Sequence, residues 1–303
     1  MRRIISKNKR NPENGSRPPF EIETVRSYDE WLSYSASMQS VFLSRRGVET
    51  DLIVTEEPFY IDGYCWVCKS PSRFKVDYLY SEIVDGRKMP NWRERLVCES
   101  CRLSNRLRAS IHIFEYLFAV NPDSTIFITE QLTPMYRYLK QHYRNTIGSE
   151  YLGSDIPHGE IRHDGLRNED LTSLSFESNM MDFILSFDCF EHIPDYINVF
   201  TECYRVLKPK GNMIFSVPFG LNSETNLVRA KVTDDGTIEH LLSPEYHGNP
   251  VDPSGGSLCF QYFGWEMLQQ LKSAGFSEAY SLLVWSLPYA YLGGFQVYFM
   301  ACK

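Results

Sequence analysis

The sequence lacks any apolar run of the length that crosses a bilayer, which is about 18 to 20 residues. The basic N-terminus MRRIISKNKRNPENGSRPP is not followed by an apolar stretch, so nothing in it resembles a secretory signal. Cysteine is scarce as well, with 8 residues in 303, far fewer than a disulfide scaffold carries. These absences predict a soluble cytoplasmic protein with no membrane partner.

The sequence also lacks an excess of positive charge. It has 31 Lys and Arg against 38 Asp and Glu, a formal net charge of −7, so no chain-wide positive field attracts a nucleic acid. We therefore expect a small-molecule substrate rather than a nucleic acid as partner, and the oligomeric state stays open. A composition with 43% hydrophobic and 23% charged residues is ordinary for globular chains, and the length suits one large domain or two modest ones.

Composition divides the chain into four segments. Residues 1–19 are rich in Lys, Arg, Asn, Pro and Gly and predict a disordered tail. Residues 20–50 carry apolar residues at helical spacing and predict a helix with Ser27 as N-cap and Gly47 as its stop. Residues 51–105 hold two cysteine pairs, and residues 106–303 form the main domain.

The two cysteine pairs share one spacing. Cys65 and Cys68 enclose two residues, Cys98 and Cys101 enclose two more, and 29 residues separate the pairs. Thiolates two residues apart in a tight turn can bind one zinc ion, and two such turns complete its four tetrahedral ligands. Because four protein ligands leave no open position, the spacing predicts a structural zinc ion in a zinc-ribbon-like module. In a reducing compartment, disulfides are the weaker alternative.

The second half of the chain alternates expected strands with expected helices. This order predicts a Rossmann-like α/β fold, with a mostly parallel sheet and helices on both faces. The expected strands are 124–129, 145–149, 181–186, 212–217, 279–285 and 296–301. The expected helices are 103–119, 135–143 with Thr133 as N-cap, 196–207 and 264–274, and a Gly-, Pro- and Ser-rich insertion covers about 220–257.

Acidic residues follow successive expected strands. Glu130 follows the first strand, and Glu150 follows the second, twenty residues later, a spacing typical of an acid that binds adenosine ribose hydroxyls. Asp170 comes before the strand 181–186, and Asp188 comes directly after it. In an open parallel sheet, ligands bind beyond the carboxyl ends of the strands, so these acids indicate one binding edge.

The segments LTSLSFESNMMDFILSFDCFEHIPD, ECYRVLKPKGNMIFSVPF and LKSAGF resemble class I S-adenosylmethionine-dependent methyltransferases of the methyltransferase type 11 kind. The resemblance covers about residues 110–303. It implies a seven-stranded sheet with a reversed last strand, S-adenosylmethionine bound across the strand ends, and methyl transfer to a nucleophile. By position, it implies that Glu150 binds the ribose hydroxyls, that Asp170 binds the adenine amino group with Leu171 beside the ring, and that Asp188 and Cys189 line the methionine side.

The turn after the first strand departs from this family's pattern. The chain has EQLTP where E/D-x-G-x-G-x-G is expected. A dinucleotide needs glycines there for its pyrophosphate, so their absence argues against a dinucleotide. S-adenosylmethionine has no phosphate, and we expect Glu130, Gln131 and Thr133 to contact it through side chains. A lost or altered cofactor site is the alternative.

Two histidines are candidates for the base that takes the proton of a hydroxyl acceptor. His192 follows the expected strand 181–186, and His247 lies in the insertion, which we predict to be a substrate lid. We rank His247 first, because a lid is specific to the acceptor. The alternatives are that Glu191 and His192 only support the fold, and that the insertion is a solvated loop.

Three functions from different classes fit these observations. The first is an S-adenosylmethionine-dependent O-methyltransferase of a sugar, a glycan end or a hydroxylated secondary metabolite, which the acidic net charge favours. The second is a protein or RNA methyltransferase that docks its substrate on the zinc module. The third is a non-catalytic, zinc-stapled binding protein.

Overall fold

The computed structural model describes residues 17–118 and 120–303. The predicted tail over 1–19 therefore lies mostly outside the described residues, as does Ala119, the expected end of one helix. Within the described ranges, no helix combines the length and the apolar character that crossing a membrane requires.

The described residues form two compact units, each made of separate stretches of chain. Unit 1 comprises residues 17–24, 38–117 and 282–296, and unit 2 comprises residues 25–37, 118–281 and 297–303. This division differs from a boundary at residue 105, because helix α3 (Asn105–Leu117) and the late stretch 282–296 both belong to unit 1. The contact between residues 282–296 and residues 38–117 joins segments far apart in the chain, so no local sequence pattern predicts it.

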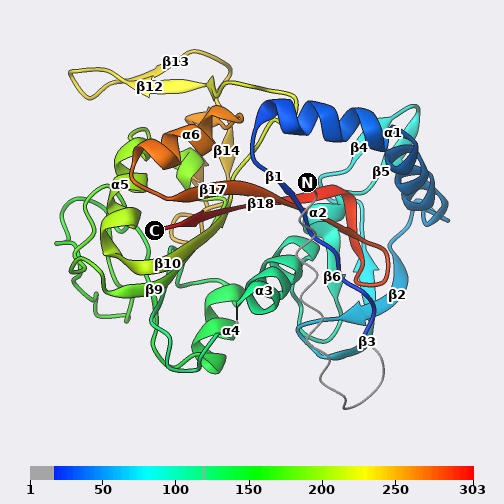
Figure 1. Cartoon of the computed structure of the whole chain (residues 1–303), viewed down its shortest axis with the longest axis horizontal. Helices are drawn as coiled ribbons and strands as arrows, with labels where there is room; N and C mark the ends of the chain where they lie inside the picture. The colour runs from blue at the N-terminus through cyan, green and yellow to red at the C-terminus, as the bar shows by residue number, and fades with distance from the viewer. Residues whose placement is uncertain (1–16, 119) are drawn as a thin grey trace. The chain divides into compact units, whose positions relative to one another are not determined.

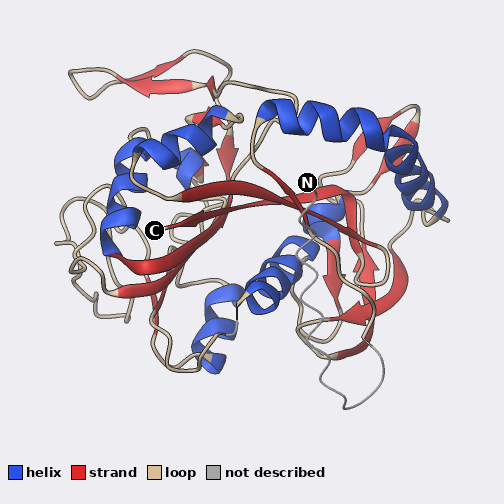
Figure 2. Ribbon diagram, viewed as in Figure 1, coloured by secondary structure: helices blue, strands red, loops and turns tan. Residues whose placement is uncertain are grey.

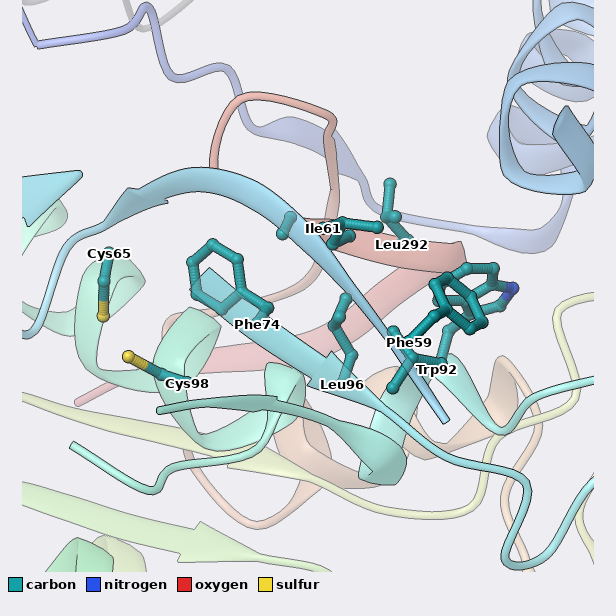
Figure 3. Packing of buried hydrophobic residues seen from close by; sticks show 10 residues of the cluster. Phe59, Ile61, Cys65, Phe74, Trp92, Leu96, Cys98 and Leu292 are labelled. Atoms are coloured by element: carbon teal, nitrogen blue, oxygen red, sulfur yellow. The ribbon is translucent and has the colours of Figure 1, made fainter. Parts of the chain in front are cut away.

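Unit 1 is built around a small antiparallel sheet (Figure 1). Its strands are β2 (Phe59–Cys65), β3 (Ser70–Val76) and β6 (Leu96–Cys98). Between β3 and β6 the chain forms the hairpin β4 (Glu82–Val84) and β5 (Arg87–Met89) and the short helix α2 (Trp92–Arg95). Alternate residues of β2 and β3 are buried, as expected for strands with one face on a core. Figure 3 shows this core, in which Phe74 and Trp92 pack with Cys65 and Cys98.

Helix α1 (Tyr28–Asp51) begins as predicted and ends later than predicted. The Glu30 amide donates to Ser27 Oγ at 3.2 Å, which confirms Ser27 as the N-cap. Gly47 does not stop the helix. The last turn is held by Glu49, whose Oε1 accepts the Gly293 amide at 2.8 Å and Trp285 Nε1 at 2.7 Å, and this tertiary contact outweighs the weak propensity of one glycine.

Seven strands form one mixed sheet in the order β1-β17-β18-β10-β9-β7-β8, which confirms the Rossmann-like α/β class (Figure 2). Four of them run parallel in the first part of the domain: β7 (Ile126–Ile128), β8 (Thr146–Gly148), β9 (Met181–Phe187) and β10 (Leu207–Ser216). The late strand β18 (Tyr291–Cys302) pairs antiparallel with β10, with Phe299 opposite Phe215, and β17 (Glu278–Ser286) follows it in the sheet. The reversed last strand implied by the family resemblance is therefore present.

The outermost strand β1 (Glu23–Val25) was not predicted, because residues 20–50 were interpreted as a helix alone. Val25 is buried, and its carbonyl accepts the Ser281 hydroxyl at 3.0 Å. Three residues carry too little alternation to be recognised as a strand from sequence. Only the sheet beside them defines β1.

Asp170 precedes β9, as expected, and lies in a loop. Between β8 and β9 the described residues form two isolated bridges, a parallel one from Glu150 to Asn168 and an antiparallel one from Ile161 to Arg167. Asn168 is buried, and its side-chain amide bonds the Leu152 amide and the Ile156 carbonyl. These side-chain bonds to backbone compete with a strand ladder and favour a compact loop.

Three helices of unit 2 confirm their sequence signals: α4 (Pro134–His142), α5 (Tyr196–Val206) and α6 (Glu266–Ser273). Thr133 caps α4 by accepting the Tyr136 amide, and Pro134 stands at the first helical position, where no amide is needed. Asp195 caps α5 in the same way by accepting the Asn198 amide.

The insertion after β10 is more ordered than a solvated loop. It forms three antiparallel pairs: β11 (Leu227–Val228) with β16 (Gln261–Tyr262), β12 (Ala230–Val232) with β13 (Ile238–His240), and β14 (Tyr246–His247) with β15 (Ser257–Leu258). The Phe260 amide donates to the Glu191 carbonyl at 2.8 Å. The insertion is therefore tied to the segment that follows β9.

The core of unit 1 generates one stability prediction at two adjacent glycines. Gly293 has φ +92°, and a Cβ there would stand 2.6 Å from the Trp92 Cβ, whereas Gly294 has φ +71° and open space around a Cβ. Gly294→Ala should lower the free energy of unfolding by about 1–2 kcal/mol through strain alone. Gly293→Ala should lower it by about 1–3 kcal/mol more through overpacking. Urea unfolding measures both variants, and equal losses would contradict the packing of Trp92 on this turn.

Candidate functional site

The carboxyl ends of four parallel strands meet at one edge of the sheet in unit 2. Ile128 of β7 pairs with Gly148 of β8 and with Leu185 of β9, and Phe187 of β9 pairs with Ser216 of β10. The residues that follow these strands therefore leave the sheet at the same edge. This edge is the place where open α/β sheets bind ligands.

Glu150 holds the turn that follows β7. Its Oε1 accepts the Gln131 amide at 2.7 Å and the Leu132 amide at 2.9 Å. Burial raises the pKa of Glu150, and these two amide bonds act against the rise. A carboxylate from the second strand end thus orders a turn that carries no glycine, a role that sequence reasoning did not assign to it.

Two other residues predicted to contact the cofactor are used by the fold around this turn. The Gln131 side chain donates to the Gly165 carbonyl and accepts the Arg167 amide, both at 2.9 Å. Thr133 is the cap of α4. Glu130 leaves the edge directly beside them and is half-buried. Cofactor contacts of Glu130, Gln131 and Thr133 remain predictions.

The segment predicted to bind adenine is a tight turn. Asp170 Oδ1 accepts both the amide and the hydroxyl of Thr172, at 2.8 and 2.6 Å, and Leu171 beside it is buried. This turn lies next to Glu150, the residue predicted to bind the ribose, because the Glu169 amide donates to the Glu150 carbonyl at 3.1 Å. The predicted roles of Asp170 and Leu171 stay predictions.

Asp188 and Cys189 follow β9 in a turn that is bonded to β10. Asp188 has φ +54°, its amide donates to the Ser216 carbonyl at 2.8 Å, and its Oδ1 accepts the Ser216 hydroxyl at 2.7 Å. Burial, together with the charges of Glu191, Glu130 and Glu150, raises the pKa of Cys189 to about 12, although a hydrogen bond to Thr129 acts against the rise. Cys189 is therefore a neutral thiol in the field of three carboxylates from three strand ends.

The structure brings the two candidate bases, His192 and His247, to one carboxylate. His192 Nε2 lies 3.6 Å from Glu191 Oε1, and His247 Nδ1 lies 3.5 Å from the same oxygen. The ring centroids of the two histidines are 4.9 Å apart. We call Glu191, His192 and His247 the Glu–His cluster.

Glu191 is the functional candidate that sequence reasoning undervalued. Its side chain is 0% exposed, and neither carboxylate oxygen has a hydrogen-bond partner among the described residues. A buried ionised group without a donor is costly, so such a group in a native protein needs a physical explanation. The available signal was a Glu directly before a His at a strand end, and only the fold shows that the Glu is enclosed.

A second layer of polar contacts orients the cluster. Glu245 Oε1 lies 3.1 Å from His247 Nε2, and Glu245 also accepts the Tyr262 hydroxyl and pairs with Arg229 at 3.0 Å. The Tyr262 bond, with His247 and Arg229, lowers the pKa of Glu245. Glu191 and then Glu245 raise the pKa of His247, although burial opposes them.

The four predicted zinc ligands of unit 1 converge. Cys65 Sγ lies 3.8 Å from Cys101 Sγ, and Cys68 Sγ lies 3.8 Å from Cys98 Sγ. Figure 3 shows the sulfurs of Cys65 and Cys98 pointing toward one another. Zinc–sulfur bonds of about 2.3 Å in a tetrahedron place the sulfurs about 3.8 Å apart, while a disulfide needs about 2.05 Å. The geometry suggests a metal site rather than disulfides.

Comparison with known proteins finds similarity in the central part of unit 2. Residues 133–215 match a family described as Methyltransferase domain. A Mycolicibacterium smegmatis protein named "Probable S-adenosylmethionine-dependent methyltransferase" is 30% identical over 77 residues, which is 25% of this chain and 30% of that protein. Phosphoethanolamine N-methyltransferase 2 of Caenorhabditis elegans is 40% identical over 42 residues, 14% of this chain and 10% of that protein. The chain thus matches 30% of the length of the first of these curated relatives and 10% of the second.

Solved structures with partial likeness carry similar names. An S-adenosylmethionine-dependent methyltransferase from Mesorhizobium loti is 13% identical, with 64% of this chain and 96% of that chain covered and a TM-score of 0.39. The Burkholderia thailandensis 1,6-didemethyltoxoflavin-N1-methyltransferase is 16% identical, with 65% and 78% covered and a TM-score of 0.39. The matched residues 133–215 contain β8, β9 and all of β10 except its last residue.

Proposed function

We propose that the protein is an S-adenosylmethionine-dependent methyltransferase that methylates a hydroxyl group of a small-molecule acceptor. The observation that carries the proposal is the overlap of the methyltransferase-domain match with the strand ends at which Glu150 and Cys189 gather. The acidic net charge of the chain favours a small acceptor over a nucleic acid.

The chemistry of this edge fits the cofactor. S-adenosylmethionine has a positively charged sulfonium and ribose hydroxyls that donate hydrogen bonds, and it has no phosphate. The carboxylates of Glu130, Glu150 and Glu191 make the surroundings of Cys189 negative, which attracts a cation and repels a phosphate. Glu150 would bind the ribose hydroxyls, Asp170 the adenine amino group, and Cys189 would lie on the methionine side as a neutral thiol.

The Glu–His cluster would serve the acceptor. When bound, the cofactor supplies an electrophilic methyl group, and the protein has to orient the acceptor oxygen and remove its proton. His192 and His247 are the imidazoles next to the strand-end carboxylates, and Glu191 and Glu245 position them. His247 lies on β14 of the insertion, which supports its ranking ahead of His192 as the group on the acceptor side.

In unit 1, the cysteine tetrahedron would hold a structural zinc ion. Two sulfur pairs match the expected separation, all four sulfurs lie within 4.8 Å of one another, and Cys65 and Cys98 are part of the hydrophobic core. Metal binding at such a site contributes directly to the free energy of folding.

The zinc proposal predicts a specific loss of stability. Cys98→Ser should remove bound zinc and lower both the yield and the melting temperature, because the ion links β6 to the turn after β2. Elemental analysis and thermal melting measure this, with Cys302→Ser, outside the tetrahedron, as the matched control. Zinc-free wild-type protein with an unchanged melting temperature would refute a zinc site.

The cofactor proposal is tested at Glu150 with two substitutions. Glu150→Ala should weaken S-adenosylmethionine binding by about 10- to 100-fold, the loss of charge-assisted bonds to the ribose. Glu150→Gln keeps an oxygen for the Gln131 and Leu132 amides and should still weaken binding about 10-fold, because the charge is gone. Isothermal calorimetry measures both, with the exposed Glu177→Ala as control. If Glu150→Gln binds like the wild type, Glu150 only holds the turn.

The acceptor proposal is tested at the two histidines. His247→Ala should lower the turnover number by about 100-fold or more and leave cofactor affinity intact, because the lost group acts on the acceptor. The assay follows S-adenosylhomocysteine formation with a panel of sugars and phenols. A comparable loss in His192→Ala alone would reverse the ranking. Unchanged turnover in both variants would mean that the acceptor arrives already nucleophilic.

A further inference from the structure

Three groups of the Glu–His cluster present lone pairs to one point. His192 Nδ1 lies 2.8 Å from the Leu258 carbonyl oxygen, which only accepts, so this nitrogen carries a proton. In the neutral ring, Nε2 is then unprotonated, and it faces Glu191 Oε1 at 3.6 Å. The backbone carbonyl thus fixes the tautomer that aims a lone pair at a carboxylate.

His247 is oriented in the same sense by a side chain. Its Nε2 lies 3.1 Å from Glu245 Oε1, and Glu245 is paired with Arg229 and accepts the Tyr262 hydroxyl. Nε2 therefore donates to Glu245, and in the neutral ring Nδ1 is a second lone pair, 3.5 Å from Glu191 Oε1.

The convergence leaves Glu191 without a donor. Both of its oxygens lack a hydrogen-bond partner among the residues that the structure describes, and its side chain is fully buried. A proton on His247 Nδ1, which Glu191 favours by raising the pKa of that ring, would leave His192 Nε2 facing Glu191 with a lone pair. Protons on both rings would place two positive charges on rings with centroids 4.9 Å apart. One divalent cation satisfies all three groups at once.

The distances suit such an ion. The nitrogen and oxygen ligand atoms of Glu191, His192 and His247 lie within 4.8 Å of one another. Bonds of about 2.0–2.2 Å in tetrahedral geometry place ligand atoms about 3.4 Å apart, close to the 3.5 and 3.6 Å found here. The donated bonds from the far nitrogens to Leu258 and Glu245 are the contacts that orient metal-binding histidines in proteins.

We propose that Glu191, His192 and His247 bind a first-row divalent cation that binds and acidifies the hydroxyl of the acceptor. With the ion bound, the two imidazoles act on the acceptor as metal ligands, and this role replaces that of a base. Two imidazole nitrogens and one carboxylate oxygen suit such ions better than Ca²⁺. Three protein ligands leave coordination positions open for an acceptor oxygen, whose proton then passes to water more readily. The role of the ion in catalysis rests on the proposed methyltransferase function, whereas its binding does not.

The site is tested with Mn²⁺, which the thiolate tetrahedron of unit 1 disfavours relative to zinc. Mn²⁺ is titrated into the full-length, zinc-containing protein, and free Mn²⁺ is counted by electron paramagnetic resonance. Elemental analysis before the titration detects any ion already bound in addition to the zinc of unit 1. The wild type should hold one divalent ion per chain beyond that zinc.

Variants locate the ion. Changes in outer contacts of a metal site cost about 10- to 100-fold in affinity, so removal of a ligand should cost at least about 100-fold. We expect this loss in Glu191→Gln and in His247→Ala. The His247 ring is partly exposed, so its removal should leave the fold intact. His163→Ala, an exposed histidine in the loop before β9, should bind like the wild type. In Glu191→Gln the amide can donate to an imidazole, so its melting temperature without added metal should not fall.

The outcomes separate this inference from the proposed function. Wild-type Mn²⁺ binding in Glu191→Gln, or no ion beyond the zinc of unit 1 at millimolar Mn²⁺, would overturn the cation site. S-adenosylmethionine affinity, measured by calorimetry on the same samples, should persist in both cluster variants. Cofactor binding and turnover without a cluster ion would refute the cation alone, and cation binding without cofactor affinity would refute the methyltransferase function alone.

Discussion

The parallel pairing of β7, β8, β9 and β10 is the constraint on which the site of unit 2 depends. Parallel strands expose their carboxyl ends at one edge, so residues that are distant in sequence leave the sheet together. Glu130, Glu150 and Cys189 become neighbours for this reason, although up to 59 positions separate them in the chain. The antiparallel strand β18 then closes β10 on its other side.

The electrostatic result of this convergence is an edge with an excess of negative charge. Burial and three carboxylates keep Cys189 a neutral thiol. Arg229 forms its ion pair with Glu245 and not with Glu191, so it does not neutralise the charge of Glu191. Such a place favours positively charged ligands, and both proposed occupants, a sulfonium and a divalent cation, are positive. The turn after β7 lacks glycine, and Glu150 takes over the ordering of its backbone.

Local signals predicted much of the fold. Thr133 and Pro134 predicted the start of α4, and the apolar runs predicted β7, β9 and β10, because caps and buried strands are encoded over a few residues. Gly47 misled because the contact of Glu49 with Gly293 is 244 residues away in sequence. The loop before Asp170, with its bridge from Glu150 to Asn168, could not be predicted, since the side-chain bonds of Asn168 had no sequence signature.

Of the two candidate metal sites, one could be predicted from local sequence and the other could not. The spacing of the cysteine pairs alone predicted that four sulfurs converge, because a two-residue turn leaves little freedom. His192 and His247 were treated as rivals, since nothing local shows that they face one carboxylate. Their shared contact with Glu191 depends on β14 and β15 folding back to the end of β9, and the enclosure of Glu191 depends on it too. Burial of a charged group is a tertiary property.

A crystal structure of the full-length protein with S-adenosylhomocysteine and Mn²⁺, with data collected at the manganese edge, tests the account most directly. The account predicts the nucleoside along the ends of β7 and β8, with its ribose at Glu150, and an anomalous peak among Glu191, His192 and His247. A nucleoside bound elsewhere, or no density for it at saturating concentration, would contradict the assignment of this edge as the methyl-transfer site.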